Sequence, residues 1–376
     1  MKAVKKASVG LALLGLLCIG AVCVFETHDD AFTEEGLLET NVSDLNRTIV
    51  TPHLETPLPS GSSVLWCGTF QLAWNEACSL IGENLRFLDE PGMVGILNKQ
   101  SFTKQDIDAA SYVAVAGFVK DDVHGKIVRQ LEETFRGQAT PRYVPSPGLT
   151  PRPQDIVAYC YLFKNLEFET PFERIEKPLR FGTEEVPCFG IGEEHKAKHH
   201  EMFSQLLILD YQGEDDFVIE LETKGKGDRV ILAKTAPEET LEATVRAVQQ
   251  RAANPEPTPP QEGDVLKVPK FNFDLTRRYA ELEGRKLQVQ NPSVAPDLLV
   301  LSALQNVRFQ LDEKGVRLRS ESPIAIGCSA GPPPPEQRHI MVFDKPFLMM
   351  LQRREADLPY FALWVGSPEL LVKGAR

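Results

Sequence analysis

The sequence lacks the short motifs that mark most enzymes and many metal sites. It contains no HExxH, no P-loop and no GxGxxG, and its histidines and cysteines form no local signature of a nucleophile. Basic residues are also outnumbered: the chain has 41 Lys and Arg against 53 Asp and Glu, which gives a net charge of -12 at pH 7. We therefore expect no enzyme, no cofactor and no resident metal, and the acidic balance argues against a general nucleic-acid binder.

Cysteine is sparse, and no two cysteines stand in a CxxC pair. Two of the seven, Cys18 and Cys23, lie in an N-terminal apolar run. The other five are widely scattered: Cys67, Cys78, Cys160, Cys188 and Cys328. Their odd number and their spacing indicate neither a zinc site nor a disulfide framework, so we interpret them as buried or idle thiols.

The segment 1–25 is predicted to be a targeting segment. Three lysines precede an uncharged run, Ser8–Phe25, and acidic residues follow at once. This pattern is typical of a signal peptide or of a short membrane anchor, and both alternatives stay open. Either one predicts an extracytoplasmic body, whether secreted, periplasmic or anchored. Residues 26–63 are polar and dotted with prolines, without a clear period, so a flexible spacer is predicted there.

Apolar periodicity predicts both helices and strands in the rest of the chain. Val64–Ile81 and Asp106–Glu133 are predicted to be helical, the second as one helix or a pair. Ile156–Phe163 is nearly all apolar and rich in strand formers, which predicts a strand buried on both faces at the centre of a sheet. Short alternating segments between residues 180 and 234 predict antiparallel strands, and residues 237–254 predict a capped amphipathic helix.

The chain is organised around a long connection between two predicted strands. Residues 307–311 alternate apolar and polar side chains, and the alternation resumes over residues 316–322, where Val316, Leu318, Ser320 and Ser322 are predicted to point inward. Pro323 and four consecutive prolines at 332–335 then exclude a regular element until the apolar run at 340–343. A connection of this length is usually either functional or disordered.

Five segments around this loop and along the chain resemble the serpins, a family of protease inhibitors. These segments are Phe118–Leu131, Val265–Phe273, Asp312–Gly315, Phe343–Leu348 and Tyr360–Pro368. The resemblance implies that residues 64–376 form one α+β domain with a large, mostly antiparallel central β-sheet and smaller sheets. It also implies a helical N-terminal half, a long exposed reactive-type loop, and a monomer whose partner is a target protease.

In serpins the target protease cleaves a bait loop, which inserts as a new central strand and distorts the acyl-enzyme. The resemblance places this loop at 316–342 and a scissile bond near Ser329–Ala330. It places the hinge at Glu313, Gly315, Val316, Leu318 and Ser320. A small residue at the scissile bond suits an elastase-like protease, whereas Arg338 would suit a trypsin-like one. The alternative is that both are ordinary loop residues.

Several residues depart from the serpin pattern. The hinge is bulky at Val316 and Leu318, where serpins carry small residues, and Pro323 has no N–H to donate to a strand ladder. Gln305 and Tyr159 stand where a histidine and an asparagine are expected, and Cys67-Gly-Thr-Phe replaces a serine-containing helix start. These departures favour an alternative function, that of a non-inhibitory serpin-fold binding or structural protein.

One weak candidate for a metal site remains, the pair His195 and His199, which stand four residues apart. On a helix the two rings could share a metal ion. The alternating Lys and Glu around them instead indicate a solvated charged loop. The sequence therefore predicts no metal site here.

Overall fold

The computed structural model describes residues 35–136, 152–192, 199–253, 256–294, 297–317 and 338–374. Several predicted features lie outside these ranges, namely the segment 1–25, Leu318, Ser320, the bond Ser329–Ala330, Cys328 and His195. Within the ranges that the structure covers, no helix has both the length and the apolar character needed to cross a membrane.

The largest sheet has seven strands and holds much of the core. Its strands, in spatial order, are β2 (Thr48–Thr51), β3 (Ser63–Cys67), β18 (Phe361–Val365), β17 (Phe347–Arg353), β11 (Asp228–Lys234), β10 (Asp216–Leu221) and β9 (Leu206–Gly213). Every pair is antiparallel except β2 with β3. Helix α5 (Leu241–Ala252) packs against this sheet. Thr240 caps its N-terminus, because the Thr240 hydroxyl accepts a hydrogen bond from the N–H of Ala243 at 3.1 Å. The helix predicted over residues 237–254 is thus confirmed.

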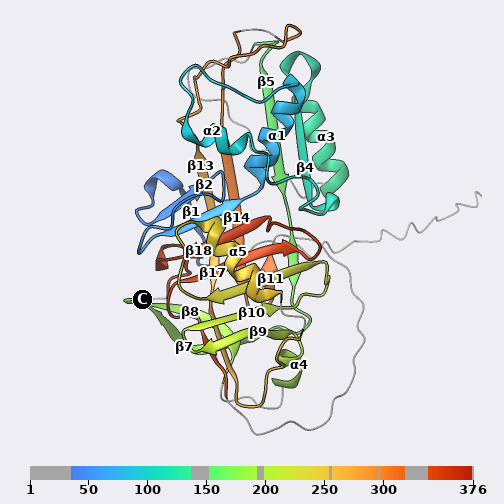
Figure 1. Cartoon of the computed structure of the whole chain (residues 1–376). Helices are drawn as coiled ribbons and strands as arrows, with labels where there is room; N and C mark the ends of the chain where they lie inside the picture. The colour runs from blue at the N-terminus through green and yellow to red at the C-terminus, as the bar shows by residue number, and fades with distance from the viewer. Residues whose placement is uncertain are drawn as a thin grey trace, which may run out of the picture. The chain divides into compact units, whose positions relative to one another are not determined.

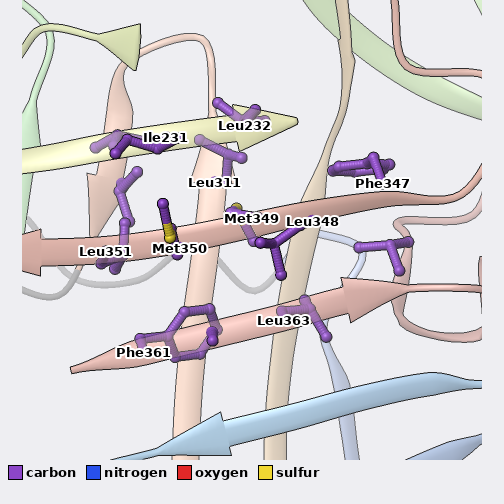
Figure 2. Close-up of a cluster of buried hydrophobic side chains, with 14 of the residues drawn as sticks. Ile231, Leu232, Leu311, Phe347, Leu348, Met349, Met350, Leu351, Phe361 and Leu363 are labelled. Atoms are coloured by element: carbon purple, nitrogen blue, oxygen red, sulfur yellow. The ribbon is translucent and has the colours of Figure 1, made fainter. Parts of the chain in front are cut away.

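A five-stranded sheet contributes the other wall of the core. Its order is β1 (Leu38–Asn41), β13 (Phe271–Arg278), β14 (Leu304–Asp312), β15 (Gly315–Arg317) and β6 (Asn165–Glu167). Side chains of β14 alternate as predicted, so Phe309 and Leu311 are buried against the seven-stranded sheet. Phe309 stacks on Phe361 with ring centroids 4.8 Å apart. Figure 2 shows Leu311 among the apolar side chains of β11, β17 and β18.

Two smaller sheets complete the fold. A four-stranded sheet orders β16 (Ile340–Val342), β12 (Val265–Pro269), β8 (Glu184–Ile191) and β7 (Glu173–Phe181), and a two-stranded sheet pairs β4 (Tyr112–Phe118) with β5 (Ile156–Leu162). The remaining helices are α1 (Thr69–Ile81), α2 (Gly92–Leu97), α3 (Val123–Phe135) and α4 (His199–Phe203). The predicted α+β class with mostly antiparallel sheets is confirmed (Figure 1).

The prediction of one helix over Val64–Ile81 was wrong in its first part. Residues Ser63–Cys67 form β3, because their apolar side chains are all buried when the segment pairs with β18 and β2. The helix starts only after Gly68. A Cβ atom on Gly68 would lie 2.2 Å from Cε1 of Phe102. The chain therefore passes from β3 to α1 at a position where a side chain would clash with Phe102.

The prediction of helix over Asp106–Glu133 was wrong in its first half, which is β4. Its small and β-branched residues alternate between buried and half-buried positions, and every residue pairs with β5. The strand at Ile156–Phe163 exists as β5, but it pairs only with β4 in the described chain and is mostly half-buried. Its apolar side chains are covered by helices rather than by further strands. Helix α1 contacts β4 and β5, and Phe135 of α3 packs edge-on against Tyr161 at 5.3 Å.

The predicted flexible spacer at 26–63 was wrong for the residues that form β1 and β2. Strand β1 adds to the edge of β13 and β2 to the edge of β3, both in parallel. Between them, the carboxylate of Glu369 accepts hydrogen bonds from the N–H groups of Asn46 at 2.8 Å and Arg47 at 2.9 Å. Glu369 stands near the opposite end of the chain from these two donors, which is why no local pattern indicated the contact.

Candidate functional site

The near end of the long loop is held inside the five-stranded sheet. Strand β15 lies between β14 and β6, and Val316 pairs with Leu311 on one side and Leu166 on the other. Val316 is fully buried and Arg317 is half-buried. Val316 therefore points into the core, as the alternation of the sequence predicts.

The turn between β14 and β15 requires glycine at position 315. Gly315 has φ of +145°, a conformation that residues with a side chain rarely adopt. A Cβ atom there would lie 2.4 Å from the carbonyl oxygen of Leu166 and 2.8 Å from Cα of Glu167. The close approach lets β15 enter the sheet immediately after the turn.

Glu313 fastens this turn to two other segments. Its carboxylate accepts a hydrogen bond from Nε of Arg174 at 2.6 Å and another from Nζ of Lys270, while its carbonyl oxygen accepts one from the N–H of Phe172 at 2.8 Å. Burial raises the pKa of Glu313, but the hydrogen bonds from Lys270 and Arg174 outweigh burial and lower this pKa to about 2. Glu313 is therefore charged throughout the physiological pH range.

Beyond β15, two strand edges lack a partner strand within the described ranges. Strand β14 pairs with β13 from Leu304 to Leu311, but with β15 only from Gln310 to Asp312. Strand β5 pairs only with β4 among the described strands, and β6 begins shortly after β5 ends. We call the edge of β14 from Leu304 to Phe309, together with the edge of β5, the strand slot. A chain that continued from Arg317 in register would enter this slot antiparallel to β14.

Gln305 joins the slot to the start of helix α1. Its side-chain N–H groups donate to the carbonyl oxygen of Cys67 at 2.9 Å and to Oγ1 of Thr69 at 3.0 Å. Its amide oxygen accepts a hydrogen bond from the hydroxyl of buried Tyr279 at 2.8 Å. The residue that departs from the serpin pattern thus connects β14, α1 and the end of β13. Tyr159, the second departure, is half-buried on β5 opposite Val115.

The far end of the loop is attached to the four-stranded sheet. Arg338 is exposed, and the next residue, His339, contacts the buried carboxylate of Asp264 through both its backbone N–H and its ring. Strand β16 then pairs with β12 in parallel. At the end of β16, the ammonium group of Lys234 donates a hydrogen bond to the carbonyl oxygen of Val342 at 3.0 Å. No sequence pattern pointed to Asp264 or Lys234, because each is an isolated charge that stands far along the chain from its partner.

The predicted site residues thus divide into two groups. Glu313, Gly315 and Val316 lie together in one turn, and Arg338 lies at the other end of the loop. No three His, Cys, Asp or Glu side chains in the described ranges are arranged to hold a metal ion, and the side chain of His199 lies outside them. The four described body cysteines are free thiols, three of them buried and Cys160 half-buried.

Comparisons with known proteins found similarity to solved structures and no match by sequence. No family model matches the chain, and no curated protein matches its sequence. Among solved structures, the chain is similar to a crystal structure described as Serpin48, a highly specific serpin of the insect Tenebrio molitor. The two are 13% identical, the match covers 82% of this chain and 92% of that one, and the TM-score is 0.44. A likeness this loose carries no information on the roles of individual residues.

Proposed function

We propose that this protein is a serpin-like, extracytoplasmic protein that offers the chain between Arg317 and Arg338 as bait to a serine or cysteine protease. The observation that carries the proposal is the position of β15, which begins a new strand between β14 and β6 and points into the strand slot. After cleavage in the loop, the N-terminal part would extend β15 while the acylated protease remains attached to the new end of the chain.

The register of β15 specifies which loop residues would face the core. Arg317 pairs with Gln310, so each further residue would lie opposite one residue earlier on β14. Leu318 would then meet Phe309, Ser320 would meet Val307 and Ser322 would meet Gln305. These three β14 residues are buried, and the sequence predicts inward positions for their partners.

The same register sets a limit to insertion. Pro323 would lie opposite Leu304, the first residue of β14, so its missing N–H would fall at the end of the ladder rather than within it. Insertion of residues 318–322 is therefore compatible with the slot. The proposal thus accommodates the proline that argues against insertion at the level of sequence.

One observation favours the alternative, a non-inhibitory binding protein. In this register Arg319 would lie beside Arg308, and like charges directly opposite each other destabilise a strand pair. Arg308 is held by Asn272, whose side-chain oxygen accepts its hydrogen bond at 2.6 Å. A loop that is cut without inserting would behave as a substrate, and the function would then be sought in binding.

Titration of the body, residues 26–376, with elastase-like and trypsin-like proteases tests the proposal. An SDS-stable adduct, together with a large rise in melting temperature of the cleaved protein, is the expected result. The variant Ser320→Pro removes a ladder donor within the inserting segment and should convert inhibitor into substrate, whereas Ser320→Ala should not. Clean cleavage without adduct or stabilisation in the unsubstituted protein would exclude inhibition and support the binding alternative.

A further inference from the structure

The far end of the loop is held by a buried carboxylate. The side chain of Asp264 is 0% exposed and lies just before β12. One of its oxygens accepts a hydrogen bond from the backbone N–H of His339 at 2.6 Å. The other lies 2.9 Å from Nδ1 of the same histidine and accepts from the N–H of Gln261 at 2.9 Å. Hydrogen bonds to an ionised, desolvated acceptor are among the stronger ones in proteins.

The neighbouring backbone groups are occupied as well. The carbonyl oxygen of His339 accepts a hydrogen bond from the N–H of Val265 at 3.0 Å. The N–H of Ile340 donates to the hydroxyl of Tyr211 at 3.2 Å, and the ring of Tyr211 meets the ring of His339 edge-on at 4.7 Å. The first two residues after Arg338 are therefore bonded along their main chain, although Arg338 itself is exposed.

A second buried charge holds the other end of β16. Lys234, with 4% of its side chain exposed, donates to the carbonyl oxygen of Val342 at 3.0 Å and to the carboxylate of Asp344 at 2.7 Å. The N–H of Phe343 donates to the carbonyl oxygen of Lys267 at 3.0 Å. A strand this short, with one parallel partner among the described strands, is intrinsically weak, so these contacts supply much of its attachment.

We propose that Asp264 and His339 form a lock that fixes the far end of the loop and protects the Arg338–His339 bond from trypsin-like proteases. Proteins commonly bind an extended peptide through main-chain hydrogen bonds to its backbone N–H and C=O groups. Here the N–H and C=O of His339 and the N–H of Ile340 are already bonded, so a protease must first detach β16. A consequence for the bait residue also follows, and it alone rests on the proposed bait function. The lock confines the bait residue to positions before Arg338, and it disfavours cleavage after Arg338 by a protease specific for arginine.

Limited trypsin digestion of the body, residues 26–376, tests the lock. The quantity measured is the rate at which the fragment that begins at position 339 appears, followed by mass spectrometry. Loss of one hydrogen-bonded buried charge should raise the population of detached β16, and with it this rate, by about tenfold to a hundredfold. We expect this increase in Asp264→Asn and in His339→Gln. The control Glu242→Gln, a carboxylate-to-amide change in the exposed pair with Arg246, should match the unsubstituted protein.

Two readouts keep the test decisive. Amide hydrogen exchange should show lost protection at residues 339–343 in the variants, while β14 keeps its protection. If Asp264→Asn unfolds the whole domain, His339→Gln decides, because it keeps the buried carboxylate and its other partners. Cleavage after Arg338 in the unsubstituted protein at the rate seen in His339→Gln would overturn the proposal. Since trypsin acts here only as a probe, the result is independent of whether any protease forms an adduct.

Discussion

Replacing Glu313 by glutamine tests whether charge holds the near end of the loop. The ordinary pKa of a glutamate is 4.5, and the pKa of Glu313 in the fold is about 2. Because this pKa is lowered on folding, the associated stability is fully present above pH 4.5. It is lost as the pH falls from about 4.5 towards 2. The difference between the two pKa values corresponds to about 3 kcal/mol of the free energy of unfolding.

The substitution should therefore lower the free energy of unfolding at pH 7 by about 3 kcal/mol, since it also leaves Lys270 without its buried acceptor. The assay is urea denaturation of both proteins at pH 7, 5 and 3.5. The gap between them should narrow at pH 3.5, because Glu313 then begins to bind a proton in the unfolded chain. The control is Glu242→Gln, which changes a carboxylate in an exposed ion pair and should shift stability by less than about 1 kcal/mol.

A constant gap between the two proteins at all three pH values would refute this reasoning. It would mean that Glu313 contributes through shape and neutral hydrogen bonds, which glutamine partly retains. A gap below about 1 kcal/mol at pH 7 would have the same meaning, because that is the size of an ordinary exposed ion pair. Either result would leave the turn held mainly by Gly315 and by the strand pairing of β15.

Two further substitutions test the other supports of the slot. Gly315→Ala should destabilise the protein by about 1–3 kcal/mol, because φ is positive there and a Cβ atom would meet the backbone of β6. Gly225→Ala, where nothing lies within 4 Å of a built Cβ atom, is the control, and equal melting temperatures would contradict the prediction. Gln305→Ala should cost about 1–3 kcal/mol by leaving the buried hydroxyl of Tyr279 without its acceptor. A loss no larger than that of the neighbouring, exposed Asn306→Ala would show that the contact contributes little.

The strands next to the long loop were predictable because one face of each is buried. Alternation of period two over residues 307–311 indicated the buried face of β14, and the same alternation indicated that Val316 points inward. In β4 the side chains are small and the apolar positions also fit a helical spacing, so the period alone did not decide between helix and strand. Pairing with β5, which follows only after helix α3 and a long connection, decided it.

The charged contacts at both ends of the loop were not predictable, and the reason is physical. A carboxylate in a sequence shows neither its burial nor its partner, and both arise only when distant strands are brought together. Glu313 meets Arg174, and Asp264 meets His339, across separations far longer than any local pattern spans. These pairs sit where the loop leaves and rejoins the sheets, so each end of the loop is held by a charged contact of its own. At the near end, β15 is followed in register by an edge of β14 that no other described strand pairs with, so the proposed insertion would lengthen β15 there. At the far end, β16 is bonded at both of its ends, so the proposed insertion would leave it in place.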